Sequence, residues 1–184
     1  QGQPSSATDS VLLVMTQPTE SIVFEQVTEE PVPSILRGFS APVIVDFDYS
    51  DAQLLSLLAH DPDPFNRWEA GQRLALRSAI YLIVSGDGST LARGLNDAYI
   101  AALRKILRDP GLDAAFKELV LTLPSETYIA EQLEVVDPQR VHTVREALRE
   151  QLASALAADW QWAYETYGHN AGYRPDTLSS GRRA

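Results

Sequence analysis

Apolar and polar positions before Ser50 alternate with the two-residue period of a β-strand. The clearest example is VIVDFDY, residues 43–49, with valines and aromatic residues on one face and two aspartates on the other. Apolar stretches also occupy residues 11–16 and 20–27, and a shorter one at 35–39 lies among prolines, which cannot donate to a sheet. We therefore expect a few short antiparallel strands, too few to complete a β-sandwich.

From Ser50 onward the apolar positions recur every three to four residues, as on one face of a helix. Ser50 followed by Gln53 matches the capping box, in which each side chain binds the other residue's backbone amide. Asp63 before Pro64 favours a helix start, because proline lacks an amide that would be unpaired there. These signals predict helices at residues 50–60, 63–85, 91–108, 113–122, 125–135 and 138–167, the last roughly 45 Å long if it is continuous.

The order of these elements predicts the organisation of the chain. A long helix after several short pairs is typical of stacked antiparallel helices, although no strict period of the tetratricopeptide or ankyrin kind is present. We expect a mostly α-helical protein, an irregular α-solenoid-like stack preceded by antiparallel β-strands from an incomplete β-sandwich domain. The expected division is a flexible tail at 1–10, the end of the β-sandwich domain at 11–49, and the N-terminal part of a truncated helical domain at 50–184. Because position 1 is Gln and the last residues carry no helix-stop signal, we interpret the chain as a fragment.

Composition and charge exclude several classes of partner. Of the 184 residues 45% are hydrophobic, enough for a packed core, and the net charge of −10 argues against binding to a phosphate backbone. No cysteine is present, which excludes disulfides and thiolate metal sites. The longest nearly apolar run, residues 79–84, is far too short to span a bilayer. We expect a soluble, cytoplasmic protein that binds neither nucleic acid nor a membrane.

No catalytic constellation is evident from the residue types. A zinc hydrolase of the common kind needs two histidines one helical turn apart, and the chain has only His60, His142 and His169, which are not paired. No Gly-x-Ser-x-Gly turn or nucleotide-binding loop occurs. The many carboxylates have ordinary roles as helix caps and solvated faces. We therefore predict no catalytic residue and no metal ligand in this chain.

Four arginines form a candidate anion-binding group in this otherwise acidic chain. Arg67, Arg73 and Arg77 lie on one predicted helix and Arg104 on the next. They could line a shared groove for an anionic group such as a peptide carboxylate. The simpler alternative is that they form ion pairs with Glu69 or with other helix carboxylates.

Several blocks of sequence resemble a known family. They are PVPSILRGFSAPV at 31–43, DPFNRWEAGQRL at 63–74, LTLPSE at 121–126, VVDPQRVHTVREALR at 135–149 and YRPDTLSSGRRA at 173–184. In this order they resemble the C-terminal part of the bacterial aminopeptidase N (alanyl aminopeptidase) family of zinc metallopeptidases. The resemblance extends over residues 11–184.

The resemblance implies a function for a longer parent protein. The parent would be a zinc-dependent metalloaminopeptidase of the membrane alanyl aminopeptidase type, which removes N-terminal residues from peptides. The family's His-Glu-x-x-His helix, third Glu ligand, Gly-x-Met-Glu-Asn motif and catalytic tyrosine match no segment here, so this chain alone is expected to be inactive and free of zinc. Its expected partners are the upstream catalytic domain and peptide substrates. The helices would cap the active-site chamber and limit access, with Arg67 and Arg104 as candidate substrate-channel residues.

A second hypothesis from another class stays open. The chain would then be a stand-alone, acidic helical-repeat module that binds a protein partner on its concave side. Both hypotheses predict strands followed by helices and no catalytic constellation, so only the extent of the reading frame separates them. An independent metal hydrolase is disfavoured by the number and spacing of histidines.

Overall fold

The computed structural model describes residues 10–25, 27–85 and 94–168. Within these ranges the regular secondary structure consists of α-helices and one 3₁₀ turn. Internal contacts divide the chain into two units, residues 1–31 and 32–184, and the helices belong to the second. None of the helices in the described ranges combines the length and the hydropathy that crossing a membrane requires.

The β-strands predicted between residues 11 and 49 are not confirmed. The described part of that stretch is irregular backbone without an assigned strand. Apolar side chains that would have formed a sheet face are exposed, among them Val14 at 70%, Val23 at 82% and Ile44 at 98%. A strand needs neighbours to pair its backbone groups, and a few short segments supply too few of them. The expected flexible tail at 1–10 lies outside the described residues except for Ser10.

The helices begin largely where the caps predict. Their bounds are α1 Asp51–His60, α2 Pro64–Ser85, α3 Asp97–Arg108, α4 Ala114–Leu121, α5 Glu126–Ala130, α6 Pro138–Ala155 and α7 Ala157–Tyr167, and η1 is the 3₁₀ turn Arg37–Phe39. Both bonds of the predicted capping box join Ser50 and Gln53 at the start of α1. Asp137 likewise caps α6 by accepting a hydrogen bond from the amide of Arg140. The prediction of a mostly helical stack is confirmed.

Three helices have bounds that differ from the predicted ones. The last is not continuous: it is interrupted at Leu156 (φ −107°, ψ 18°), which separates α6 from α7. Leu156 is completely buried, and the break allows α7 to pack against α3 instead of running straight on. Helix α5 ends at Ala130, five residues earlier than predicted. Helix α3 begins at Asp97 because Asn96 caps it, while residues 91–93 of the predicted helix lie outside the described part.

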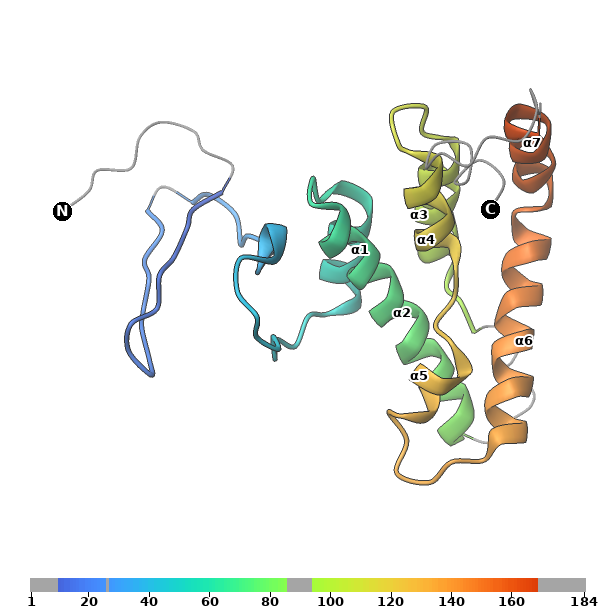
Figure 1. Ribbon diagram of the computed structural model, residues 1–184, viewed down its shortest axis with the longest axis horizontal. Helices are drawn as coiled ribbons and strands as arrows, with labels where there is room; N and C mark the ends of the chain where they lie inside the picture. Colours follow the sequence, from blue (N-terminus) through green and yellow to red (C-terminus); the bar gives the residue numbers. More distant parts are fainter. Residues whose placement is uncertain (1–9, 26, 86–93, 169–184) are drawn as a thin grey trace. The chain divides into compact units, whose positions relative to one another are not determined.

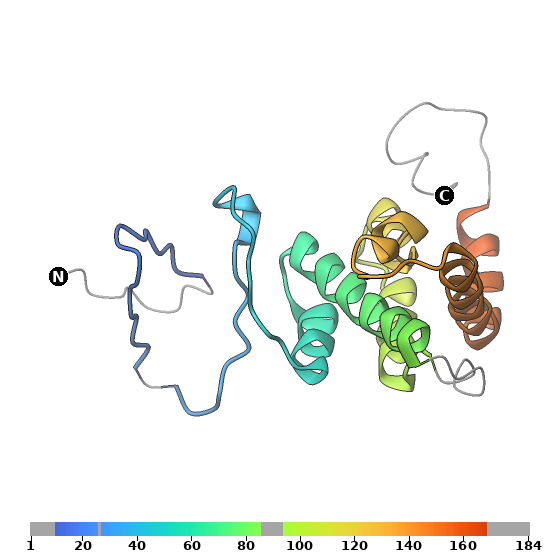
Figure 2. The same cartoon turned by 90° about the horizontal axis from the view of Figure 1, so that it is seen from below.

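The helices pack as neighbouring pairs and not around a central axis. Helix α1 packs along α2, and α2 then contacts α4, α5 and α6 along its length. Helix α3 contacts α1, α4 and α7. Figures 1 and 2 show α6 and α7 following one another along one side of the helical unit. This arrangement is an irregular stack, consistent with a sequence that has no strict repeat.

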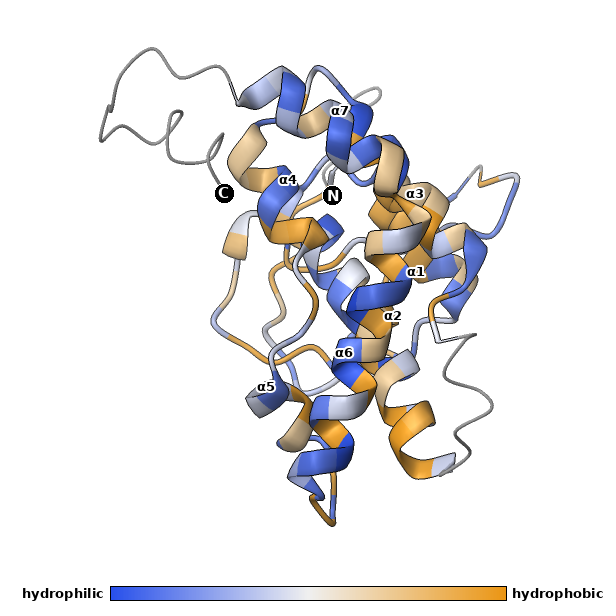
Figure 3. Ribbon diagram, turned by 90° about the vertical axis from the view of Figure 1, so that its right-hand side faces the viewer, coloured by the Kyte–Doolittle hydropathy of each residue, from blue (hydrophilic) through white to orange (hydrophobic). Residues whose placement is uncertain are grey.

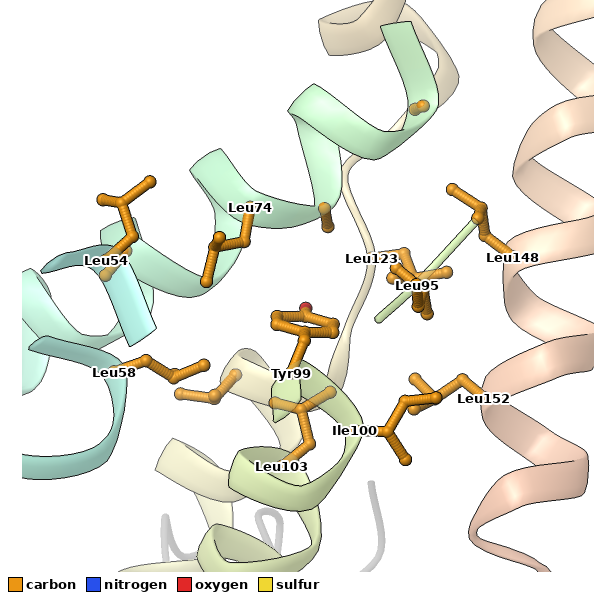
Figure 4. Packing of buried hydrophobic residues seen from close by; sticks show 14 of the residues in the cluster. Leu54, Leu58, Leu74, Leu95, Tyr99, Ile100, Leu103, Leu123, Leu148 and Leu152 are labelled. Atoms are coloured by element: carbon orange, nitrogen blue, oxygen red, sulfur yellow. The ribbon is translucent and has the colours of Figure 1, made fainter. Parts of the chain in front are cut away.

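One hydrophobic core joins the helices. Tyr99 of α3 lies near its centre in Figure 4, between Leu58 and Leu74 on one side and Leu95 and Leu148 on the other. Burial raises the pKa of the Tyr99 hydroxyl far above its ordinary value. In Figure 3 hydrophobic residues are grouped in α2 and α3, whereas the exposed turns of α7 are mainly hydrophilic. The core is therefore built by the inward faces of several helices together.

Two glycines permit close packing in this core. A Cβ atom on Gly71 of α2 would lie 3.3 Å from Leu58 Cδ1, so α1 and α2 approach closely there. A Cβ atom on Gly94 would collide with Leu148 and Leu82. The adjoining backbone is held by Gln151 of α6, whose side chain binds both the amide and the carbonyl of Leu95.

Candidate functional site

Arg67 fastens three helices to one another. Its Nε donates a hydrogen bond to the carbonyl of Leu58 in α1 (3.0 Å), and its guanidinium lies over the ring of Phe116 in α4, 5.5 Å from the centroid. Burial lowers the pKa of Arg67, and the negative charges of Asp109 and Asp61 act in the opposite direction. The side chain is therefore occupied by contacts within the helical unit.

Arg104 forms part of a charge cluster between α3 and α7. Its Nε donates to Oδ2 of Asp159 (2.9 Å), and its Nη2 donates to the carbonyl of Ala155 (2.8 Å). Arg108, one turn later, donates from Nε to Oδ1 of the same aspartate (2.7 Å) and lies over the ring of Trp162. The Asp159 side chain is only 10% exposed, against 46% for Arg104. For Arg104 the alternative interpretation, an ion pair with a helix carboxylate, is the arrangement seen.

Asp159 is held as a carboxylate by these two arginines. Burial works to raise its pKa, but the hydrogen bonds from Arg108 and Arg104 outweigh burial, so that the pKa lies below its ordinary value. Within the described residues Arg67 and Arg104 share no partner, since one contacts α1 and α4 and the other α6 and α7. The structure does not bring the two predicted channel residues together.

Arg73 and Arg77 contact the segment that precedes α1, and Arg77 also contacts the first residue of α1. Arg73 donates from Nη2 to the carbonyl of Phe47 (2.9 Å) and lies over the ring of Tyr49. Arg77 pairs with Asp51 (2.8 Å) and more distantly with Asp48 (3.4 Å). Neither arginine pairs with Glu69 in the described part of the chain.

Residues Val32–Tyr49, which we call the strap, are tied by polar contacts to α2 and to the turn between α1 and α2. Asn66 of α2 donates through its amide nitrogen to Ser34 Oγ (2.8 Å) and to the carbonyl of Ile35 (3.0 Å). Tyr49 is the one residue of the strap that is buried, and its hydroxyl donates back to the carbonyl of Pro33 (2.8 Å). The bonds from Asn66 span 32 and 31 residues of sequence and the bond from Tyr49 spans 16, so no local pattern could have revealed them.

A second group of contacts holds the tight turn in the strap. Leu36, Gly38 and Phe39 have left-handed backbones with φ of 56°, 61° and 55°, an unfavourable conformation for residues other than glycine. The amide of Gly38 donates to Asp63 Oδ2 (2.8 Å), and Arg37 pairs with Asp61 Oδ1 (3.3 Å). The strained turn is thus fixed from the loop between α1 and α2.

A cavity of about 260 Å³ lies between the strap and α2. Its walls are mainly apolar, with Ile35, Val43 and Val45 from the strap and Leu54, Leu57 and Ala70 from the helices. Three polar side chains on one face of α2 also line it, namely Asn66, Glu69 and Arg73. It combines concavity, apolar walls and a few polar groups, as small-molecule sites do.

Glu69 is the unusual group in this cavity. It is partly buried, and no hydrogen bond or ion pair reaches its carboxylate from the described residues. Burial raises its pKa, although the positive charge of Arg73 partly offsets this effect. Sequence reasoning treated Glu69 only as a partner for arginine. The helical spacing 66, 69, 73 does place these residues on one face, but nothing in the sequence shows that an apolar wall would cover that face.

The described residues do not offer a metal site. No three His, Cys, Asp or Glu side chains among them are close enough to hold one ion. Two of the three histidines can be placed: His60 is exposed at the end of α1, and His142 contacts Glu126 through Nδ1 at 2.8 Å on the surface. His169 lies outside the described residues.

Two family models together match nearly all of the chain. Residues 1–48 match a domain of unknown function (DUF3458) with an Ig-like fold, and residues 51–184 match a domain of unknown function (DUF3458_C) with ARM repeats. The chain belongs to the DUF3458_C family. The ARM-repeat description of this family agrees with the irregular stack of helices.

Relatives found by sequence comparison carry a more informative name. Aminopeptidase N of Caulobacter vibrioides is 35% identical over 176 residues, which are 96% of this chain and 20% of that protein. Aminopeptidase N of Escherichia coli is 36% identical over 165 residues, 90% of this chain and 18% of that protein. The predicted resemblance to the C-terminal region of bacterial aminopeptidase N is confirmed. The DUF3458_C chain spans about one fifth of the length of these relatives.

A solved structure supports the same relationship. The crystal structure of Legionella pneumophila aminopeptidase A in complex with aspartic acid matches with a TM-score of 0.70 and 26% identity. The match covers 86% of this chain and 19% of that protein. The likeness thus extends from the sequence to the fold of the DUF3458_C chain.

Proposed function

We propose that this chain is a non-catalytic part of a zinc-dependent, cytoplasmic aminopeptidase that removes N-terminal residues from peptides. The observation that carries the proposal is the 36% identity to Escherichia coli aminopeptidase N over 90% of the chain. The chain would supply the end of the Ig-like domain at residues 11–49 and the beginning of the helical domain at 50–184. Its partners would be the catalytic domain of the same polypeptide and, through it, peptide substrates.

In this proposal the zinc belongs to parts of the parent outside this chain. The described residues contain no cluster of three metal-ligating side chains, so they do not fit a zinc site, and we assign them no step of the reaction. Their contribution in this proposal is to hold the helical stack in place within the parent. The contacts between the strap and α2 join the Ig-like part of the sequence to the first pair of helices, which favours a helical stack held at a fixed place in the parent.

A helical stack held in this way is suited to form one wall of the active-site chamber and to limit the entry of substrates. The test is to measure kcat/KM of the intact protein for alanine dipeptides and for alanine peptides of eight to ten residues. Weakening the strap by Arg73→Ala should change the ratio between long and short substrates, because the wall would no longer be held in place. An unchanged ratio in an R73A variant that stays folded would contradict the capping role.

The assignment of Arg67 and Arg104 to the substrate channel stays a prediction, and Arg108 offers a matched control for the second. Arg104 and Arg108 bind the same carboxylate, so loss of either weakens the contact between α3 and α7. If Arg104 also contacts peptides, Arg104→Ala should raise KM for long peptides while Arg108→Ala does not. Equal effects of the two substitutions would mean a structural role alone. Arg67→Ala should be compared in the same way with Arg77→Ala.

The first experiment tests the parent activity. The intact protein and the 184-residue chain would be assayed side by side on alanine p-nitroanilide, with zinc measured on both. An active, zinc-containing parent and an inert chain would support the proposal. An inert parent would contradict it and would favour the stand-alone interaction module.

A further inference from the structure

We propose that the cavity between the strap and α2 binds a small primary alkylammonium ion, with Glu69 as the acceptor of its charge. This inference is independent of the proposed aminopeptidase function. It depends on the cavity, on the acceptors in its wall and on the absence of a donor to them within the described residues.

The carboxylate of Glu69 receives no hydrogen bond or ion pair from the described residues, although the charge of Arg73 acts on it from a distance. Arg73, one turn further along α2, is turned toward the strap, where it donates to the carbonyl of Phe47 and covers the ring of Tyr49. Both bonds donated by the Asn66 side-chain amide go to Ser34 and to Ile35. A partly buried carboxylate without a donor destabilises the fold, and a bound cation would offset that cost.

A second acceptor lies one turn before Glu69. The side-chain oxygen of Asn66 accepts no hydrogen bond from the described residues, although its amide nitrogen is fully used. Asn66 and Glu69 both line the cavity. An ammonium group has three donors and no acceptor, so it can bind a carboxylate and an amide oxygen together.

The apolar wall of the cavity determines what kind of chain the ammonium group is attached to. Apolar side chains from the strap and from α1 and α2 form most of the wall, which favours an alkyl arm. The volume, about 260 Å³, is just below the usual range for drug-sized ligands, so the ligand must be small. Arg73 also lines the cavity, and its positive charge disfavours a ligand with a second ammonium group. Glu69 in turn disfavours an anion, and a metal ion would lack the three close ligands that it needs.

The experiment is isothermal titration of the complete encoded polypeptide at pH 7.5 with n-hexylamine, which is protonated at this pH. Hexanol, hexanoate and 1,6-diaminohexane serve as ligands of matched length with a different charge. We expect saturable binding of n-hexylamine, weaker binding of hexanol and of the diamine, and none of hexanoate. Glu69→Gln should weaken n-hexylamine binding at least about tenfold, the usual effect of losing a charge-assisted hydrogen bond.

Two further variants separate the cavity from other amine sites on the polypeptide. Glu134→Gln removes an exposed carboxylate in the loop before α6 and should leave binding unchanged. Val43→Phe should fill the cavity and weaken binding without altering the charge of the cavity, since Val43 lies in its wall. Val43 is 60% exposed, so the larger side chain should leave the fold intact. Any binding elsewhere is common to all variants and cancels in the comparison. Equal affinity of the Glu69→Gln and Glu134→Gln proteins, or equal affinity for n-hexylamine and hexanol, would overturn the proposal.

Discussion

The strap and the helical core are held in place by different kinds of interaction. The core is a set of leucines, valines and alanines that are almost completely buried, with Leu58, Leu103 and Leu156 at 0% exposure. In the strap only Tyr49 is buried, and the segment is held by hydrogen bonds from Asn66 and Arg73. One region depends on the removal of apolar surface from water and the other on a few directed bonds.

This difference shows how much each region depends on a single residue. In the core, a large-to-small substitution leaves a cavity, and the cavity lowers the free energy of unfolding, by about 2–5 kcal/mol for leucine to alanine. A hydrogen bond that contributes about 1 kcal/mol net can be lost without unfolding the molecule, but its loss can free the segment that it holds. Four substitutions test this comparison, from the largest expected effect to the smallest.

Leu58→Ala should reduce the free energy of unfolding by about 2–5 kcal/mol, because it removes buried methyl groups from the contact between α1 and α2. Leu119→Ala is the matched control, since Leu119 is also helical but is 53% exposed. We expect the control to change stability by less than about 0.5 kcal/mol. Urea denaturation measures both. Equal losses would mean that burial does not distinguish the core.

Asp159→Asn should reduce the free energy of unfolding at pH 7 by about 2 kcal/mol, since it weakens two charge-assisted bonds to arginine. The pKa of Asp159 is lowered in the folded protein, so its stabilising effect is present above the unfolded value near 4 and is lost as the pH falls through the folded pKa. The difference between the wild type and the variant should therefore vanish in acid. Thermal denaturation between pH 7 and pH 2.5 measures this, with Glu150→Gln on exposed surface as the control. A difference that does not depend on pH would argue against the ion pairs.

Arg73→Ala should cost about 1 kcal/mol, because it removes one hydrogen bond and one cation–π contact from the strap. Its main effect should be local. Hydrogen exchange should become faster at the amides of residues 43–49 and stay unchanged in α3 and α6. Lys105→Ala, which removes an exposed cation from α3, is the control. Faster exchange throughout the helices would mean that the strap is part of the core.

Glu69→Gln is expected to have the smallest effect and the opposite sign. The pKa of Glu69 is raised by burial, so its contribution to stability is present below the unfolded pKa and is lost as the pH rises through the folded pKa. Replacing it with a neutral amide should therefore raise Tm slightly at pH 7 and leave it unchanged near pH 3. Glu134→Gln should have no effect at either pH. A lower Tm of the Glu69→Gln protein at pH 7 would mean that the carboxylate has a stabilising partner.

The helical region could be predicted from the sequence because its signals are local. The capping box at Ser50 and the aspartate–proline pairs at 63–64 and 137–138 act within one turn, and each marks the start of a helix. The break at Leu156 could not be predicted in this way. It depends on the contact of α7 with α3, where the partners Asp159 and Arg108 are 51 residues apart.

The predictions for the remaining regions are limited by the same dependence on contacts distant in sequence. The alternating pattern at 43–49 favours a strand, but a strand also requires a neighbour, and periodicity does not supply one. The positions of Arg67 and Arg104 were inferred from charge and helix order alone, which do not reveal the partners that hold them. Glu69 was overlooked because the strap that covers its cavity is joined to α2 only by long-range contacts.

The strap also determines where the polypeptide can be divided. A fragment that begins at Ser50 would retain helices α1 to α7 but would remove the strap partners of Asn66, Asp63 and Arg73 and would uncover the apolar face beneath them. The smallest helical fragment suitable for expression should therefore begin at Val32. For the same reason, a protease acting on the native protein should cut more readily before Val32 than at the point where the first helix begins.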